Sequence, residues 1–297
     1  MTKESKDSSD GYERLADMNT DGKNEYDQVS HMLREVVANY TDLSNVFRDF
    51  YNENLRKLPE QADRIGSELG NSLNGAKEVV DSMSDLSPAA FASGSHVSKM
   101  FANSSVFVLF AVFSSLIGHY LASPVFNLVF LKLGAVLIVS LLIPFVSRLI
   151  FFNSKHRLTE KSKRIMCATF IFEHSILIGF INQSNWFDTP SAFMTQIVAS
   201  FAYPVMLSYT DDRSKLLGAV ASGSMLFHVA HAVLTLNITF GFLLVAALYT
   251  LLAIAFIQYI ITFRTRPEFD DIHVSMQYVF AVSLVKMFSL MALGEEK

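Results

Sequence analysis

Long apolar runs follow one another through the last two thirds of the chain, and short polar segments separate them. A hydrocarbon core of about 30 Å needs on the order of 20 apolar residues per helix. The runs lack the ten-residue alternation that is typical of an outer-membrane barrel. The pattern therefore predicts an all-α polytopic membrane domain over residues 95–297, a bundle of seven transmembrane helices. The runs that reach or approach the required length are 101–121, 126–152, 165–182, 192–209, 216–234, 240–263 and 274–293.

The N-terminal part has a different pattern and is expected to be a soluble tail. Residues 1–26 are polar without periodicity, so we expect disorder there. Across residues 27–94, two amphipathic helical stretches flank Leu58-Pro59, and a linker of small residues follows. Two interpretations stay open, a helical hairpin or a coiled-coil surface for self-association or a partner helix. The first seam consists of Val29, Leu33, Val36, Tyr40, Leu43, Phe47 and Phe50.

Composition and charge support this division into tail and membrane domain. Of the 297 residues 51% are hydrophobic and only 18% are charged. A soluble domain is typically about a quarter charged. Residues 1–99 have a net charge of −7 and residues 100–297 a net charge of +3, and the single cysteine, Cys167, excludes a disulfide framework. The first 25 residues resemble no secretory leader, so the first apolar run is expected to act as its own insertion signal.

Lysine and arginine in the connections predict the orientation. The connections at 153–164, 210–215 and 264–272 all contain Lys or Arg, whereas those at 122–125, 183–191 and 235–239 contain none. Basic connections stay cytosolic, so the N-terminus is predicted to be cytosolic. The last run could cross the membrane or re-enter, because Lys286 and the charged C-terminus would suit either arrangement.

Motifs for enzymatic chemistry and for nucleic-acid binding are missing. The chain has no phosphate-binding glycine loop, no His-Glu-x-x-His and no nucleophile elbow. An acidic tail beside a weakly basic membrane part is atypical of nucleic-acid binding. We therefore expect no enzyme, no nucleic-acid partner, no resident metal and no cofactor.

Ionisable residues inside the apolar runs are the candidate sites, because charge in lipid is costly and usually faces a bundle interior or a cavity. Glu173 and His174 lie near the middle of the third run, and Lys132 or Arg148 of the second run could pair with the carboxylate. His228 and His231 lie three residues apart on one face of the fifth run. These six residues could form an ion or proton pathway, with calcium or the proton as the permeant ion. The alternatives are snorkelling for the cations and bundle hydrogen bonds for the histidines.

From about residue 95 the order of features resembles the Bax inhibitor-1 (TMBIM, Lifeguard-related) family. The resemblance begins with His96-Val-Ser-Lys99-Met before a Phe/Ala-rich helix and continues with the basic segment Leu158 to Arg164. It extends over Thr189-Pro190-Ser191-Ala192-Phe193-Met194, Ser208-Tyr209, Arg213-Ser214, Gly218 and the closing segment Val285 to Leu293. The N-terminal tail has no counterpart in that family.

The resemblance implies a seven-helix protein of the endoplasmic reticulum membrane. It also implies negative regulation of apoptosis and stress, contacts with apoptosis-regulating membrane proteins, and modulation of store calcium. The family's pair of buried aspartates is missing here. Ile257 and Gln258 occupy the region of the first aspartate, Ser275, Met276 and Gln277 occupy that of the second, and Asp270 and Asp271 fall in the preceding loop. Two alternative functions are the ion or proton pathway and a membrane-anchored interaction protein acting through the 27–86 tail.

Overall fold

The computed structural model describes residues 93–129, 131–154, 158–186, 189–266 and 269–296, together with the isolated positions 48, 77 and 81. Our expectations for the tail, which are disorder over 1–26, amphipathic helices over 27–86 and the seam from Val29 to Phe50, lie outside the described residues. All the elements below belong to one compact unit, residues 57–297.

The described residues fold almost entirely into helices. In chain order these are α3 (Gly94–Ile117), α4 (Ser123–Val129), α5 (Lys132–Leu137), α6 (Ile143–Ser154), α7 (Glu160–Ile181), α8 (Ala192–Leu207), α9 (Arg213–Leu234), α10 (Phe240–Phe263) and α11 (Asp271–Leu293). A short π-helical segment, η3 (Gly118–Ala122), joins α3 to α4, and a second one, η4 (Ile138–Leu142), joins α5 to α6. A 3₁₀ turn, η5 (Asn182–Ser184), follows α7. Strands β1 (Asn185–Trp186) and β2 (Glu295–Glu296) form a short antiparallel pair.

Side-chain caps define where several helices begin. Thr159 accepts a hydrogen bond from the Ser162 amide at the start of α7, and Thr239 accepts one from the Phe242 amide at the start of α10. Asp212 accepts from the Ser214 and Lys215 amides at the start of α9. The hydrogen bond from Ser214 also holds the pKa of the Asp212 carboxyl below its usual value. Each cap satisfies amides that have no carbonyl partner inside the helix.

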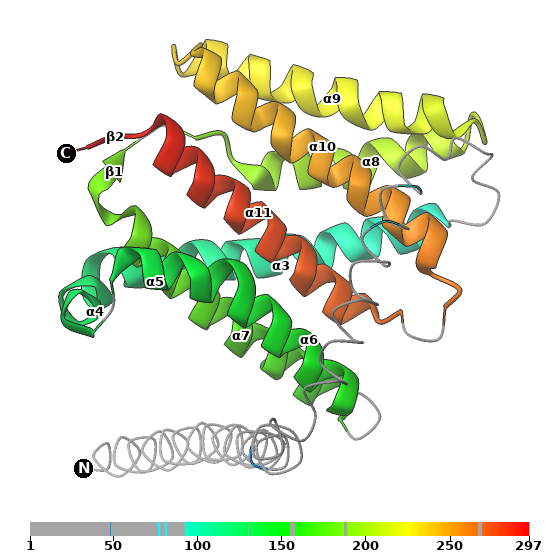
Figure 1. The fold of residues 1–297 in the computed structure, drawn as a ribbon. Helices are drawn as coiled ribbons and strands as arrows, with labels where there is room; N and C mark the ends of the chain where they lie inside the picture. Colours follow the sequence, from blue (N-terminus) through cyan, green and yellow to red (C-terminus); the bar gives the residue numbers. More distant parts are fainter. Residues whose placement is uncertain are drawn as a thin grey trace, which may run out of the picture. The chain divides into compact units, whose positions relative to one another are not determined.

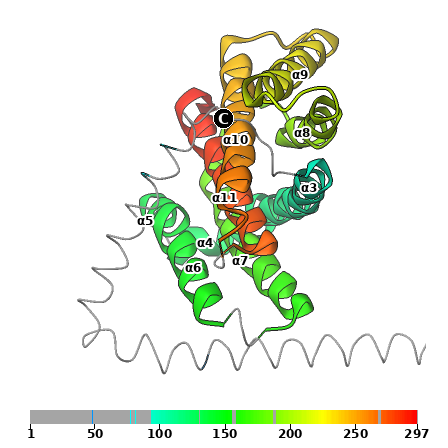
Figure 2. The same ribbon diagram turned by 90° about the vertical axis from the view of Figure 1, so that its right-hand side faces the viewer.

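α3 and α11 form the centre of the bundle (Figure 1). α7 packs against both of them, together with α5 and α6 on the same side, and α8, α9 and α10 pack on the other side. Figure 2 gives the same order from the side. α4 points away from the direction of α3. The helix axis changes at η3, and π-helical segments commonly accompany such a change.

α3 and α7 cross at an unusually short distance, and glycine makes that crossing possible. A Cβ atom at Gly118 would overlap the Ile176 carbonyl, and a Cβ atom at Gly179 would overlap the Ser115 carbonyl. Two glycines therefore bring the backbones of two helices into direct contact, a packing mode that is frequent between transmembrane helices.

The all-helical class is confirmed, but seven long helices are not. Among the residues that the structure describes, six helices are long and apolar enough to cross a membrane, namely Gly94–Val129, Lys132–Phe151, Glu160–Ile181, Arg213–Leu234, Phe240–Phe263 and Asp271–Leu293. The predicted run 192–209 forms only the 16-residue α8, which lies between a connection ending in Pro190-Ser191 and a turn at Ser208-Tyr209. α11 is one continuous 23-residue helix, and β2 beyond it pairs with the connection that follows α7. The fold therefore contains no re-entrant bend within residues 271–293.

Candidate functional site: the polar end of the bundle

The helix ends gather at two opposite ends of the bundle (Figure 1). One of these, which we call the polar end, contains the starts of α3, α7, α9 and α11 and the last turns of α6, α8 and α10. His96 near the start of α3 lies 3.6 Å from Asp271, and the Ser98 hydroxyl donates to the Ser200 carbonyl of α8 at 2.6 Å. The predicted basic connections thus share one end, and the Lys- and Arg-free connections 183–191 and 235–239 lie at the other. The predicted connection 122–125 is wrong, because these residues belong to η3 and α4. Described basic residues at the polar end include Lys99, Lys161, Lys163, Arg164, Arg213, Lys215, Arg264 and Arg266.

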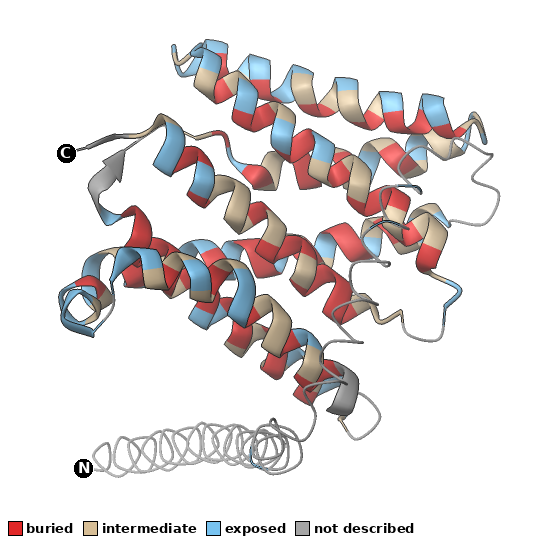
Figure 3. Ribbon diagram, in the orientation of Figure 1, coloured by how far each residue is buried: buried red, intermediate tan, exposed pale blue. Residues whose placement is uncertain are grey.

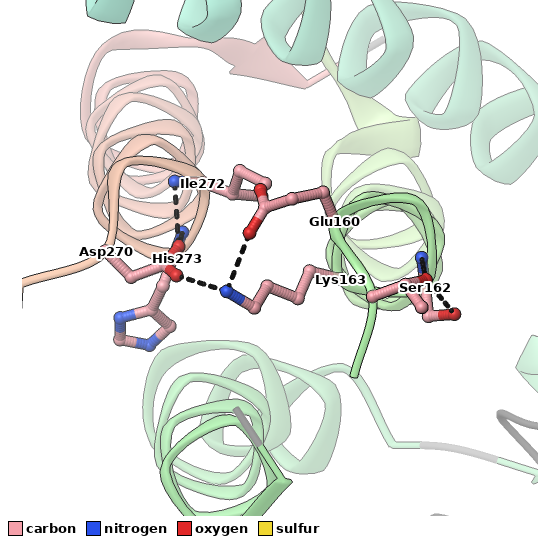
Figure 4. Close-up of polar contacts among 7 residues, drawn as sticks. Glu160, Ser162, Lys163, Asp270, Ile272 and His273 are labelled. Atoms are coloured by element: carbon pink, nitrogen blue, oxygen red, sulfur yellow. Dashed lines mark hydrogen bonds and ion pairs between the residues drawn. The ribbon is translucent and has the colours of Figure 1, made fainter. Parts of the chain in front are cut away.

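At the polar end, Lys163 pairs with two carboxylates, those of Asp270 and Glu160 (Figure 4). Its ammonium lies 2.9 Å from Oδ2 of Asp270 and 2.9 Å from Oε1 of Glu160. The Lys163 and Asp270 side chains are only 12% and 17% exposed, whereas that of Glu160 is 71% exposed. The pair with Asp270 is therefore the one shielded from solvent, and it ties the first turn of α7 to the first turn of α11.

Asp270 has a second role as the N-cap of α11. Its Oδ1 accepts hydrogen bonds from the Ile272 amide at 3.0 Å and the His273 amide at 3.2 Å, while its Oδ2 faces Lys163. We expected Asp270 and Asp271 to lie in a loop, but Asp270 caps α11 and Asp271 is its first residue. One carboxylate thus fixes both the start of a helix and its attachment to a neighbour.

Aromatic and imidazole rings surround this pair. The His273 ring stacks on Phe151 of α6 with centroids 4.4 Å apart, and its Nε2 lies 3.3 Å from the side-chain amide of Gln277. The His96 ring lies beside Phe269. Helices α3, α6, α7 and α11 therefore converge on one cluster of polar and aromatic side chains.

A second buried polar contact joins α9 to α10. The Arg213 guanidinium, only 2% exposed, donates from Nε to the Gln258 side-chain carbonyl, and its second amino group lies 3.4 Å from the Thr262 hydroxyl. Gln258 is fully buried. Burying a cation is costly unless hydrogen bonds accompany it, and these two contacts contribute to that compensation.

The cations expected in or near the second run lie at its edges. Lys132 is the first residue of α5 and is exposed, and Arg148 is exposed on α6. Glu173 is exposed on the outer side of α7, and no hydrogen bond or ion pair joins its carboxyl group to any residue that the structure describes. The expected pairing of Glu173 with Lys132 or Arg148 is therefore not seen.

The predicted histidines have separate surroundings. His174 is buried and packs against Phe280 with ring centroids 4.4 Å apart. His228 is buried and its Nε2 lies 2.7 Å from the Thr195 hydroxyl of α8, while the His231 ring stacks on Phe242. Within the described ranges, no group of three or more His, Cys, Asp or Glu residues could hold a metal ion. The ion or proton pathway expected for these residues stays a prediction.

The positions compared with the missing aspartates are also packing positions. Ile257, Ser275 and Met276 are fully buried, as is Gln258, whereas Gln277 is half-buried and faces His273. Sequence reasoning placed Gln258 in the region of the first missing aspartate and missed that its partner is Arg213. It also missed the pair Lys163–Asp270, for which an acidic residue four positions before the last apolar run was an available signal.

Comparison with known proteins identifies a family. The family model described as "Interactor of ZYG-11" matches residues 4–296 of the chain. No curated protein and no solved structure matches.

This finding overturns the resemblance to the Bax inhibitor-1 family. The expected regulation of apoptosis and the expected modulation of store calcium are therefore wrong, and of the expected partners only a protein partner in general is supported. The features that suggested the resemblance are basic connections, a proline before a helix and Phe-, Leu- and Ser-rich helices. Basic connections and apolar helices are general features of membrane-protein sequences and do not identify one family.

Proposed function

Since the chain belongs to the Interactor of ZYG-11 family, we propose that it is an integral membrane protein that binds ZYG-11 as a protein partner. The family match over residues 4–296 is the observation that carries this proposal, because the family's name states the interaction. The proposal assigns no catalytic reaction to the chain.

The exposed surface of the helices supports the membrane part of the proposal. Figure 3 shows in pale blue the exposed positions on the described helices. Many of these positions carry large apolar side chains, where a soluble protein would place charges. The most exposed of them lie at the end opposite the polar end, where Leu128, Leu131, Leu234 and Leu236 are 87%, 84%, 83% and 92% exposed. Side chains of this kind are stable in contact with acyl chains and not with water.

The polar end supports an orientation. Basic residues concentrate where α3 begins, so the tail that precedes Gly94 leaves the bundle at that end. Lys and Arg near helix ends mark the cytosolic side. We therefore assign the polar end and the tail to the cytosol, with the endoplasmic reticulum as the proposed membrane.

The tail is the proposed contact for ZYG-11. Residues 1–99 contain 11 Lys and Arg and 18 Asp and Glu, so most of the charged surface of the chain lies there. Its apolar seam from Val29 to Phe50 repeats every three or four residues, as in helices that dock on a partner groove. The lipid-facing helices would then act as the anchor.

Substitutions in the seam test this assignment in the full chain. With Leu33→Asp and Leu43→Asp together, we expect the affinity for ZYG-11 to fall at least tenfold, because two carboxylates enter the apolar face. The measurement is the Kd of the detergent-solubilised protein for purified ZYG-11. Ser30→Asp with Ser44→Asp adds the same charge beside the seam and should leave the Kd within about twofold. Equal loss in both variants would contradict the seam, and no binding by the unaltered protein would contradict the proposed function.

A further inference from the structure

Two arginines and a tyrosine lie where α8, α9 and α10 meet at the polar end. Arg213 is the first residue of α9, Arg264 directly follows the last residue of α10, and Tyr203 lies one turn before the end of α8. The Arg213 guanidinium contacts Thr262, two residues before Arg264, so it lies against the last turn of α10. The positive charges of both arginines act on the Tyr203 hydroxyl. The three side chains therefore share one environment.

Polar atoms of this cluster are buried without hydrogen-bond partners. Tyr203 is fully buried, and among the described residues its hydroxyl has no partner. Nη1 of Arg264 is likewise buried, and no described group accepts a hydrogen bond from it. Folded proteins satisfy the great majority of their buried polar atoms. Two unpartnered donors in one cluster therefore indicate a ligand that accepts hydrogen bonds from both.

The charge of the cluster indicates that this ligand is an anion. Arg264 forms no ion pair with any carboxylate that the structure describes. Asp212, the acidic residue next to Arg213, caps α9 and lies 3.3 Å from the Lys215 ammonium. Two guanidinium groups near one buried hydroxyl repel each other, and buried charge needs compensation. An anion between them would remove both costs.

A phosphate monoester matches the cluster in charge and in hydrogen bonding. It carries a charge of about −1.5 to −2 at neutral pH, which balances two guanidinium groups. Its oxygens accept from the planar fork of an arginine and from a hydroxyl. Basic pockets between transmembrane helices on the cytosolic side are also typical binding places for anionic lipid headgroups.

We propose that Tyr203, Arg213 and Arg264 form a binding site for a phosphate monoester, supplied by a phospholipid headgroup such as that of phosphatidate or by free phosphate. Nη1 of Arg264 and the Tyr203 hydroxyl donate to the phosphate oxygens, and Arg213 adds positive charge. The lipid source rests on the proposed membrane embedding, whereas the phosphate site does not depend on binding of ZYG-11.

The test titrates the full chain, solubilised in detergent, with dioctanoyl phosphatidate, and calorimetry gives the Kd. The comparison ligands are inorganic phosphate and dioctanoyl phosphatidylserine, whose phosphate is a diester. We expect phosphatidate to bind at least tenfold more tightly than phosphatidylserine. Tighter binding of phosphatidate than of inorganic phosphate assigns the headgroup as the source, and equal binding of the two assigns free phosphate.

Two substitutions remove the proposed donors one at a time. Arg264→Gln should weaken phosphatidate binding at least tenfold and Tyr203→Phe at least threefold, because hydrogen bonds to a charged group are stronger than those between neutral groups. Tyr203→Phe keeps the buried ring, so a loss of affinity in this variant reports on the hydroxyl. Thermal unfolding in detergent checks that each variant is folded.

Arg266→Gln is the matched control. It removes the same charge two residues further along the chain, at an exposed position where the guanidinium lies over the Phe263 ring at 4.4 Å. The Kd for phosphatidate should stay within about twofold of that of the unaltered protein, because Arg266 lies outside the proposed site.

Three results would overturn the proposed site. They are the absence of binding of both phosphatidate and inorganic phosphate, equal affinity for phosphatidate and phosphatidylserine, and unchanged affinity in folded Arg264→Gln and Tyr203→Phe proteins. Vesicle flotation separates these results from failure of the proposed function. A chain that floats with vesicles and binds ZYG-11 but no phosphate contradicts only the phosphate site, whereas a chain that stays with the buffer contradicts the embedding.

Discussion

Gly179→Ala is expected to destabilise the helix bundle by about 3 kcal/mol, the upper part of the usual range for overpacking. The new Cβ atom would overlap the Ser115 carbonyl and lie 2.8 Å from the His119 amide nitrogen. These are backbone atoms, so no side-chain rotation can relieve the clash. α3 and α7 would have to separate, and both helices also pack on α11. Thermal unfolding in detergent, followed by circular dichroism, measures the change.

Two other glycines provide the controls for this variant. A Cβ atom at Gly134 of α5 or Gly218 of α9 would meet nothing within 4 Å. Alanine favours a helix interior over glycine by about 1 kcal/mol, so Gly134→Ala and Gly218→Ala should be neutral or slightly stabilising. If Gly179→Ala unfolded at the same temperature as Gly218→Ala, the close crossing of α3 and α7 would be wrong.

Asp270→Ala is the second substitution with a large expected effect, a loss of about 2–3 kcal/mol. It removes the N-cap of α11, which is worth about 1 kcal/mol. It also removes the shielded partner of Lys163, whose ammonium then keeps only the exposed Glu160. Chemical unfolding of the purified protein in detergent gives the difference in free energy.

Asp270→Asn separates the two roles of this side chain. Asparagine is also a good N-cap, so this variant should retain the helix start and lose only the charge, at a cost of about 1 kcal/mol. Glu160→Gln should cost less than about 0.5 kcal/mol, because its ion pair with Lys163 is mostly exposed. An Asp270→Ala variant as stable as Glu160→Gln would show that the pair does not join α7 to α11.

The apolar runs predicted helix positions well where the length of the run matches the thickness of a bilayer and polar residues flank both of its ends. The run 240–263 coincides with α10, since Thr239 caps its start and basic residues follow its end. The run 192–209 was less informative, because apolar composition alone does not distinguish a long helix from the 16-residue α8. α7 begins five residues before its apolar run, because the polar first turn is stabilised by contacts to α11 that sequence does not display.

For the candidate residues, the sequence predicted the position along each helix but not the direction of the side chain. That direction depends on how neighbouring helices pack, which a single sequence does not give. His174 and His228 are buried, and Glu173 faces outward. The Gly118–Gly179 crossing was also beyond prediction, since small residues are frequent throughout the apolar runs.

In the proposed function, the apolar helices anchor the chain in a membrane and the charged tail binds the partner. The ion pair and the caps at the polar end fix the starts of the helices. This division of roles explains why the chain has an extended polar N-terminus in front of helices that carry few charges.

Flotation of ZYG-11 with vesicles that contain the full chain tests the central claim most directly. The protein is reconstituted into phosphatidylcholine vesicles, purified ZYG-11 is added, and the mixture is centrifuged through a density gradient. We predict that ZYG-11 rises with these vesicles, and that it stays at the bottom with empty vesicles or with vesicles carrying the Leu33→Asp, Leu43→Asp protein. ZYG-11 that stays at the bottom in the presence of the unaltered, vesicle-bound chain would contradict the account.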